Sequence, residues 1–459
     1  MADLDPYELT AGQLRDLFDR LVVPYVFGAS QPSNQPIAIL TGAQPAAGKS
    51  RAMAAVREQN ADRDVIQLSG DDMRQFHPAF AELMDTDPIA MVPATQQAAN
   101  AWMQMAFTHA IEHGYSFVSE GTFRNPEAVL ADAKFFATGQ RGEELAAPLP
   151  EGRDRHQVWI LALAVRAERS RLDAMHRYLA PGAEAGRWVW PEWANASYNA
   201  IPVTVAAAEE SPDVHRVIVT NRSGADLYTN TRQADGTMQR PPAAAEAVLT
   251  ERARPLPTAD ADGWLTRQQD VVLRFVATGQ VNATTYEGLR IALTDAWAII
   301  PMSSAAAGQS LLDAQEVQSS LDRLLHWAHE GPHLQRPVLL IPDAVIHARL
   351  AQPNSQRTLG LTAELRGELG RRTALSPAVR TVEDAIRTSA QTLAELRRGA
   401  TRIPGPAGPG LSAAAARSRS TTTAPTGKRQ STATTGEQAA HLRRAAQDGQ
   451  QRRHGPTQR

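Results

Sequence analysis

Short apolar runs alternate with helical patterns over the first half of the chain. Apolar residues at three- and four-residue spacing predict an N-terminal helix, and they are Leu14, Leu17, Phe18, Leu21 and Val22. The later helical stretches each follow an apolar run, and strands that alternate with helices predict an α/β fold with a parallel sheet flanked by helices. Ligands of such sheets bind beyond the carboxyl ends of the strands. The predicted strands are residues 37–40, 64–68, 116–119, 158–165 and 214–220.

The second half of the chain has a different pattern. A shift to Pro, Ala and acidic residues predicts a linker at 231–260, and helical periodicity predicts an α-helical region at 261–400. Residues 401–459 are rich in Pro, Gly, Ser, Thr and Ala and have almost no large apolar side chains, so a disordered tail is expected. The predicted helices of this half are residues 264–277, 286–299, 311–329 and 377–398.

Composition narrows the class of protein. The chain has 459 residues, enough for two or three domains, and a formal net charge of −2. A net charge this close to zero does not indicate that the chain as a whole binds nucleic acid or membranes. The tail alone is basic, with ten Lys/Arg and two acidic residues. A solvated tail is expected, and a nucleic-acid or partner-binding tail is the alternative.

Cysteine is absent, which excludes disulfides, thiol catalysis and Cys-ligated metal and suits a reducing cytoplasm. No apolar run approaches the ~20 residues of a membrane span, and the acidic N-terminus does not resemble a signal peptide. We therefore expect a cytoplasmic protein with no membrane partner.

The loop after the first predicted strand carries the main candidate chemistry. It ends in Gly48, Lys49 and Ser50, and an alanine-rich helical stretch follows. Strand, loop, Gly-Lys-Ser and helix is the order of a phosphate-binding P-loop. There, backbone N–H groups and a helix N-terminus hold a phosphate, the lysine neutralises its oxygens, and the serine hydroxyl binds Mg²⁺. An ordinary strand-to-helix turn is the alternative.

Acidic residues follow the next two predicted strands. Phosphoryl transfer needs a carboxylate for the acceptor hydroxyl, and Asp71, directly after Gly70, is a better candidate base than Asp72. One of the two aspartates could instead cap the next turn. Glu120 follows the third strand, so these groups could converge with the P-loop on one cleft.

Taken together, these residues resemble the zeta toxin family, the P-loop kinases of epsilon–zeta toxin–antitoxin systems. The resemblance covers about residues 10–230, so that 1–230 is predicted to be a zeta-toxin-like P-loop kinase domain. It implies an enzyme that uses ATP and Mg²⁺ to phosphorylate the 3′-hydroxyl of UDP-N-acetylglucosamine, and a small helical antitoxin that occludes the ATP site. The resemblance rests on segments 43–50, 70–78 and 119–122, on Arg177-Tyr178 and on Gly186-Arg187.

The same resemblance implies a role for each matching residue. The catalytic residues would be Asp71, Lys49, Arg177 and Arg187. The ATP phosphates would be bound by Gln44, Gly48, Lys49, Ser50 and Arg51, and Mg²⁺ would be bound by Ser50. The substrate would be bound by Glu120, Thr122 and Arg74. The chain departs from the family pattern at four places, namely Ala43 and Ala46 for glycines, Ser69 for an acid, and Ala194-Asn195 for a His-Asp pair.

Several interpretations stay open. The altered loop is also compatible with a non-catalytic nucleotide-binding module that works through a protein partner, or with a P-loop kinase for another small hydroxyl acceptor. Trp188, Trp190 and Trp193 either pack in a core or stack on a planar ligand. His326, His329 and His333 are expected to be structural, with metal binding as the alternative.

Overall fold

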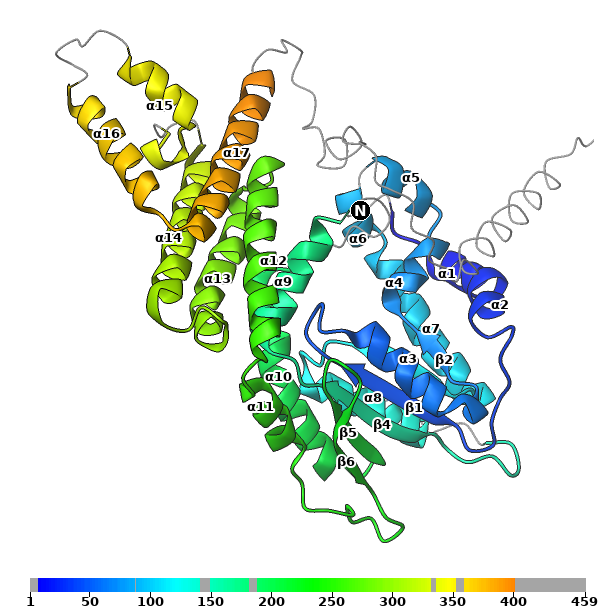
Figure 1. Ribbon diagram of the computed structural model, residues 1–459. Coiled ribbons are helices and arrows are strands. Elements are labelled where there is room, and N and C mark those ends of the chain that lie inside the picture. Colours follow the sequence, from blue (N-terminus) through cyan, green and yellow to red (C-terminus); the bar gives the residue numbers. More distant parts are fainter. Residues whose placement is uncertain are drawn as a thin grey trace, which may run out of the picture. The chain divides into compact units, whose positions relative to one another are not determined.

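The computed structural model describes residues 7–86, 88–140, 149–180, 188–331, 336–351 and 359–400 (Figure 1). The described residues form two compact units. One unit comprises residues 7–30 and 69–107, and the other comprises 31–68 and 108–400. The predicted tail at 401–459 lies outside the described residues.

A six-stranded sheet with the order β2-β3-β1-β4-β5-β6 forms the centre of the second unit. The first five strands in this order are parallel, as predicted, whereas β6 pairs antiparallel with β5. This last strand follows a tight turn at residues 221–224, which leaves no room for the helix that a parallel crossover needs. The strands are β1 (Ile37–Gly42), β2 (Ile66–Leu68), β3 (Phe117–Gly121), β4 (Gln157–Leu163), β5 (Arg216–Thr220) and β6 (Asp226–Thr231).

The central strand β1 is buried along its whole length. On one face, Ile37 and Ile39 share an apolar cluster with Met53 of α3 (Lys49–Gln59). On the other, Phe117 of β3 meets Phe136 of α8 (Pro126–Thr138) edge to face, with ring centroids 5.1 Å apart. Helices on both faces explain why these strands are apolar throughout.

The range predicted as a linker, 231–260, contains a packed helix, α11 (Ala244–Ala253). The buried carboxylate of Glu209, near the end of α10 (Pro191–Glu210), accepts a hydrogen bond from the Ala244 amide at 2.9 Å and so caps this helix. Tyr228 and Asn230 of β6 donate to the same carboxylate at 2.7 and 2.8 Å. These contacts hold α11 against the antiparallel edge of the sheet.

The helical region shares a core with the part of the chain that contains the sheet. Leu172 and Met175 of α9 (Ala167–Tyr178) belong to the same apolar cluster as the buried faces of the long C-terminal helices. The helices of this region are α12 (Thr258–Ala277), α13 (Ala283–Ile299), α14 (Gly308–Glu330), α15 (Asp343–Leu350), α16 (Leu359–Ala374) and α17 (Pro377–Ala400). This region is therefore packed onto α9 and does not project as a separate arm.

The first unit is helical. The predicted N-terminal helix is present as α1 (Ala11–Leu17), a π-helical turn (Phe18–Val22) and α2 (Val23–Val26), so it continues through Pro24. Trp102, fully buried, donates its indole N–H to the Leu14 carbonyl at 3.0 Å. The other helices are α4 (Gly70–Met73), α5 (Phe80–Thr86), α6 (Pro88–Ala94) and the start of α7 (Gln96–His113). In the part of the chain that is described, no helix combines the length and apolar character needed to cross a membrane.

Candidate active site

The P-loop forms at the carboxyl end of β1. Gly48 is the N-cap of α3 with φ = 103°, a left-handed conformation that glycine adopts without strain. The first intrahelical hydrogen bonds run from the amides of Arg51 and Ala52 to the Gly48 carbonyl, at 3.1 and 3.3 Å. The preceding amides lie at the positive end of the helix dipole, where an anion is stabilised.

The two unusual alanines of the loop have different surroundings. Ala46 has φ = 61°, so it adopts the left-handed conformation that a glycine would favour at this point. Ala43 has no positive φ and is fully buried. The loop therefore bends as a glycine-containing loop would, with backbone strain at Ala46.

Gly42 has a packing role. A Cβ atom at Gly42 would lie 1.9 Å from the Phe123 ring, so only glycine fits at the end of β1. Phe123 is itself buried and has φ = 52°. This contact explains a glycine one residue earlier than the P-loop pattern places it.

Lys49 and Glu120 lie together, as the strand order predicts. The Lys49 side chain is 8% exposed, donates to the Ala43 carbonyl at 3.1 Å and lies 3.7 Å from a Glu120 oxygen. Glu120 stands opposite Thr41 in the parallel register of β3 and β1. A buried cation and a partly exposed carboxylate thus meet at the carboxyl edge of the sheet.

Two buried polar side-chain atoms lie in β1 and in the loop that follows it, and the sequence pointed to only one of the two residues, Gln44. Thr41 Oγ1 and the side-chain oxygen of Gln44 have no hydrogen-bond partner among the described residues. Buried polar groups are normally paired, so a ligand or its bound water would satisfy them. The Thr41 hydroxyl can donate to a phosphate oxygen, whereas the Gln44 oxygen can only accept, for example from a water molecule. The Thr41 hydroxyl and the amides at the start of α3 therefore fit a bound phosphate group.

Gln44 was predicted to bind phosphate, but its side-chain amide has another role. It donates to the Val165 carbonyl at 2.8 Å and to the Ser170 hydroxyl at 3.3 Å, and so fastens the loop to the end of β4 and to α9. Ser50, Arg51, Thr122 and Arg177 have exposed side chains. Arg187 lies outside the described residues, so its predicted role stays a prediction.

Asp71 and Arg74 belong to the first unit. Asp71 lies in α4, is 54% exposed and is 3.3 Å from the Arg74 guanidinium. Arg74 is buried and donates to the Val92 carbonyl and to the side chains of Thr95 and Gln96, at 2.7, 2.9 and 2.7 Å. The structure thus gives Arg74 a role in joining the end of α4 to α6 and α7, and its role as a substrate ligand stays a prediction.

An arginine that sequence reasoning missed lies against the loop. Arg222, two residues beyond β5, donates to the Ala46 carbonyl at 3.3 Å and forms an ion pair with Asp173 of α9. Its position just past a strand end was the signal that could have identified it.

The three tryptophans divide between core and surface. Trp188 packs with Tyr178 and Phe275, whereas Trp190 and Trp193 are 39% and 57% exposed. The Arg124 guanidinium lies 5.6 Å from the centre of a Trp193 ring. No group of metal-binding side chains occurs within the described ranges; His329 stacks on Tyr286, and His333 lies outside those ranges.

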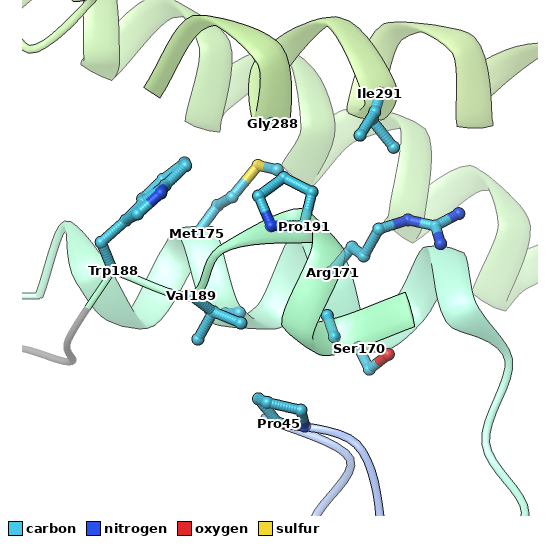
Figure 2. A pocket seen from close by; sticks show the side chains of 11 residues that line it. Pro45, Ser170, Arg171, Met175, Trp188, Val189, Pro191, Gly288 and Ile291 are labelled. Carbon is cyan, nitrogen blue, oxygen red and sulfur yellow. The ribbon is translucent and has the colours of Figure 1, made fainter. Parts of the chain in front are cut away.

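A small pocket connects the back of the P-loop with the helical region. Figure 2 shows Pro45 on one side of it, Met175 and Arg171 of α9 in the middle, and Gly288 and Ile291 of α13 on the other. A Cβ atom at Gly288 would lie 2.9 Å from Trp188, so this glycine allows α13 to approach closely. The helical region thus contacts the segments that support the loop.

A glycine-capped loop between a central parallel strand and a helix that starts with Lys-Ser defines a P-loop protein, a class that binds nucleotide phosphates. Residues 26–233 match the family model described as Zeta toxin. This part of the chain is therefore similar to the zeta toxin family.

Individual relatives of the chain are named as toxins. The chain is 28% identical over 127 residues to Toxin zeta of Enterococcus hirae, covering 28% of this chain and 42% of the relative. It is 25% identical over 146 residues to Toxin PezT of Streptococcus pneumoniae, covering 32% of this chain and 51% of the relative. The chain thus spans about half the length of these curated relatives. A solved structure from a study of the Streptococcus pneumoniae PezAT toxin–antitoxin system is 18% identical, with a TM-score of 0.46 over 58% of this chain and 99% of that one.

Proposed function

We propose that the chain is an ATP-dependent phosphotransferase that moves the γ-phosphate onto the 3′-hydroxyl of UDP-N-acetylglucosamine and acts as a toxin. The proposal rests on the similarity to the zeta toxin family and, above all, on the Lys49–Glu120 pair at the carboxyl edge of the sheet, 3.7 Å apart beside the P-loop. A lysine at this place neutralises the β- and γ-phosphate oxygens, where charge develops during transfer.

The nucleotide would be held by the loop itself. The amides at the start of α3 and the Lys49 ammonium would bind its phosphates, and the Ser50 hydroxyl would be a ligand of Mg²⁺. Bound Mg²⁺–ATP supplies the phosphoryl group and neutralises part of its charge. Lys49 is almost fully buried, and exclusion of water strengthens its attraction for phosphate.

The acceptor side involves Glu120, Thr122 and Asp71. Glu120 and Thr122 lie at the end of β3 and would hydrogen-bond the sugar. Asp71 takes the proton of the acceptor hydroxyl as the oxygen–phosphorus bond forms; its place three residues after β2 supports this role. Arg177 and Arg187 would stabilise the charge on the transferred phosphoryl group.

A small helical antitoxin is the partner that this family role implies. Such a protein would keep the kinase silent by occluding the nucleotide site. Co-expression of the chain with the protein encoded by a neighbouring short reading frame tests this part separately: relief of growth inhibition is expected. Growth that is inhibited equally with and without that protein would contradict it.

The enzymatic proposal is tested by measuring ADP release from Mg²⁺–ATP in the presence of a panel of nucleotide sugars. We expect UDP-N-acetylglucosamine to stimulate release, and Lys49→Ala and Asp71→Asn to abolish the stimulation. Asp72→Asn is the matched control for the base and should remain active. Stimulation by a different hydroxyl acceptor would support the phosphotransferase activity and contradict the proposed substrate. If no acceptor stimulates ADP release, the proposal is wrong.

A further inference from the structure

Arg222 is held against the P-loop by contacts on two sides. Its guanidinium donates to the Ala46 carbonyl at 3.3 Å, and its Cγ lies 3.7 Å from the position that a Cβ of Gly48 would occupy. On its other side it forms an ion pair with Asp173, whose side chain is only 14% exposed. The arginine is thus fixed beside the two residues whose left-handed backbone shapes the loop.

Positive charge exceeds negative charge at this place. Asp173 is shared, because Arg267 of α12 also pairs with it, at 2.9 Å. Arg169 and Arg51 lie close enough to Arg222 to lower the pKa of its guanidinium, an effect that adds to the larger effect of burial. Arg169 also pairs with Asp260, at 3.7 Å, so two aspartates face four guanidinium groups here. An additional anion would relieve the remaining repulsion.

The charge lies where a nucleotide is expected. Arg222 follows the carboxyl end of β5, and the loop that carries it runs along α3, since a Cβ at Gly224 would lie 3.9 Å from Ala55. Planar guanidinium groups bind phosphate oxygens through paired N–H groups, and Arg222 is 29% exposed, so part of its surface remains available to a ligand.

We propose that Arg222 is a binding residue for the polyphosphate of the nucleotide, and that Asp173 is the residue that positions it against the loop. This inference rests on the proposed function for the presence of a nucleotide at the P-loop. It adds a phosphate contact from the β5 end of the sheet to those from Lys49 and the start of α3. It also connects this contact to the helical region, because Arg267 shares Asp173.

Binding measurements without turnover test the inference. Calorimetry on the full chain would compare ATP with inorganic tripolyphosphate, which lacks base and sugar. Arg222→Gln is expected to weaken both ligands by about tenfold to one hundredfold, the loss typical of a charge-assisted hydrogen bond. The decrease of affinity with rising salt should also become shallower. Arg290→Gln, an exposed arginine on α13, is the matched control and should change neither ligand.

Two further variants separate the roles. Arg222→Lys keeps the charge without the planar fork and should weaken both ligands by a smaller factor, roughly threefold to tenfold. Asp173→Asn should weaken both ligands even though it makes the site more positive, because Arg222 is no longer held against the loop. The salt dependence should stay steep, because the phosphate-binding cation is still present.

The other outcomes contradict the inference, the proposed function, or both. If Arg222→Gln weakens ATP but leaves tripolyphosphate unchanged, Arg222 contacts the base or sugar. If Arg222→Gln does not fold, wild-type affinity of Arg222→Lys for both ligands contradicts a phosphate contact. A wild-type protein that binds both ligands but transfers no phosphate would contradict the proposed function alone; one that binds neither would contradict both.

Discussion

Replacing Ala46 by glycine is expected to stabilise the protein. Ala46 has φ = 61°, and the left-handed conformation costs an L-residue with a Cβ about 1–2 kcal/mol. Glycine removes that cost, but it also loosens the unfolded chain, which subtracts about 0.4–1 kcal/mol. The expected net gain in the free energy of unfolding is therefore about 0.5–1 kcal/mol, with tighter binding of Mg²⁺–ATP if strain limits closure of the loop.

The neighbouring residue provides a matched control. Ala47 is fully buried and has no positive φ, so Ala47→Gly should destabilise by about 1 kcal/mol through chain entropy and should lose methyl packing in addition. Urea unfolding followed by circular dichroism would compare the two variants in the same buffer. If Ala46→Gly lowers the unfolding midpoint as Ala47→Gly does, the loop is not strained at Ala46 and our explanation of its shape is wrong.

Three further predictions concern packing, charge and pH. Gly42→Ala should destabilise by about 1–3 kcal/mol in urea unfolding, because the new Cβ would overlap the Phe123 ring. Arg171→Met should cost about 3–5 kcal/mol by the same measurement, because it leaves Asp295, 10% exposed and paired with Arg171 at 2.6 Å, as an uncompensated buried charge. Burial lowers the pKa of His156 from 6.5 to about 4. The neutral ring therefore stabilises the fold above pH 6.5, and this stability is lost as pH falls toward 4. His156→Gln should flatten that part of the curve of unfolding free energy against pH.

A specific result would contradict each of these three predictions. Gly263→Ala in α12 is the control for Gly42→Ala, because a Cβ at Gly263 meets nothing within 4 Å, and it should stabilise the protein. If Gly42→Ala also stabilises the protein, the contact with Phe123 is not rigid. Arg290→Met breaks an exposed ion pair and should lower the free energy of unfolding by less than about 1 kcal/mol. If Arg171→Met lowers it by no more than Arg290→Met does, the buried ion pair contributes no more than a surface pair. An unchanged pH dependence in His156→Gln would show that other groups cause it.

The convergence of Lys49 and Glu120 could be predicted from the sequence because it follows from strand order. Apolar runs mark the buried parallel strands, their carboxyl ends meet at one edge, and a residue just past a strand end must lie there. The register that places Glu120 opposite Thr41 supplies the short distance to Lys49.

Contacts between distant side chains could not be predicted in this way. Nothing in the sequence around Arg222 or Asp173 indicates their pairing, which depends on where α9 lies relative to the loop after β5. Arg74 appeared as a ligand residue because of its place in a motif, and only its hydrogen bonds to α6 and α7 show its structural role. The helix α11 was not predicted from the sequence because few of its residues are buried, and because its cap comes from Glu209, on another helix.

The most direct test of the central claim is transfer of labelled γ-phosphate from ATP to UDP-N-acetylglucosamine, with the position of the label determined in the product. We predict label at the 3′-oxygen of the sugar for the wild-type chain, none for Lys49→Ala, and none when the acceptor lacks the 3′-hydroxyl. Label that Lys49→Ala transfers as well as the wild-type chain, or no label on the sugar at all, would contradict the account.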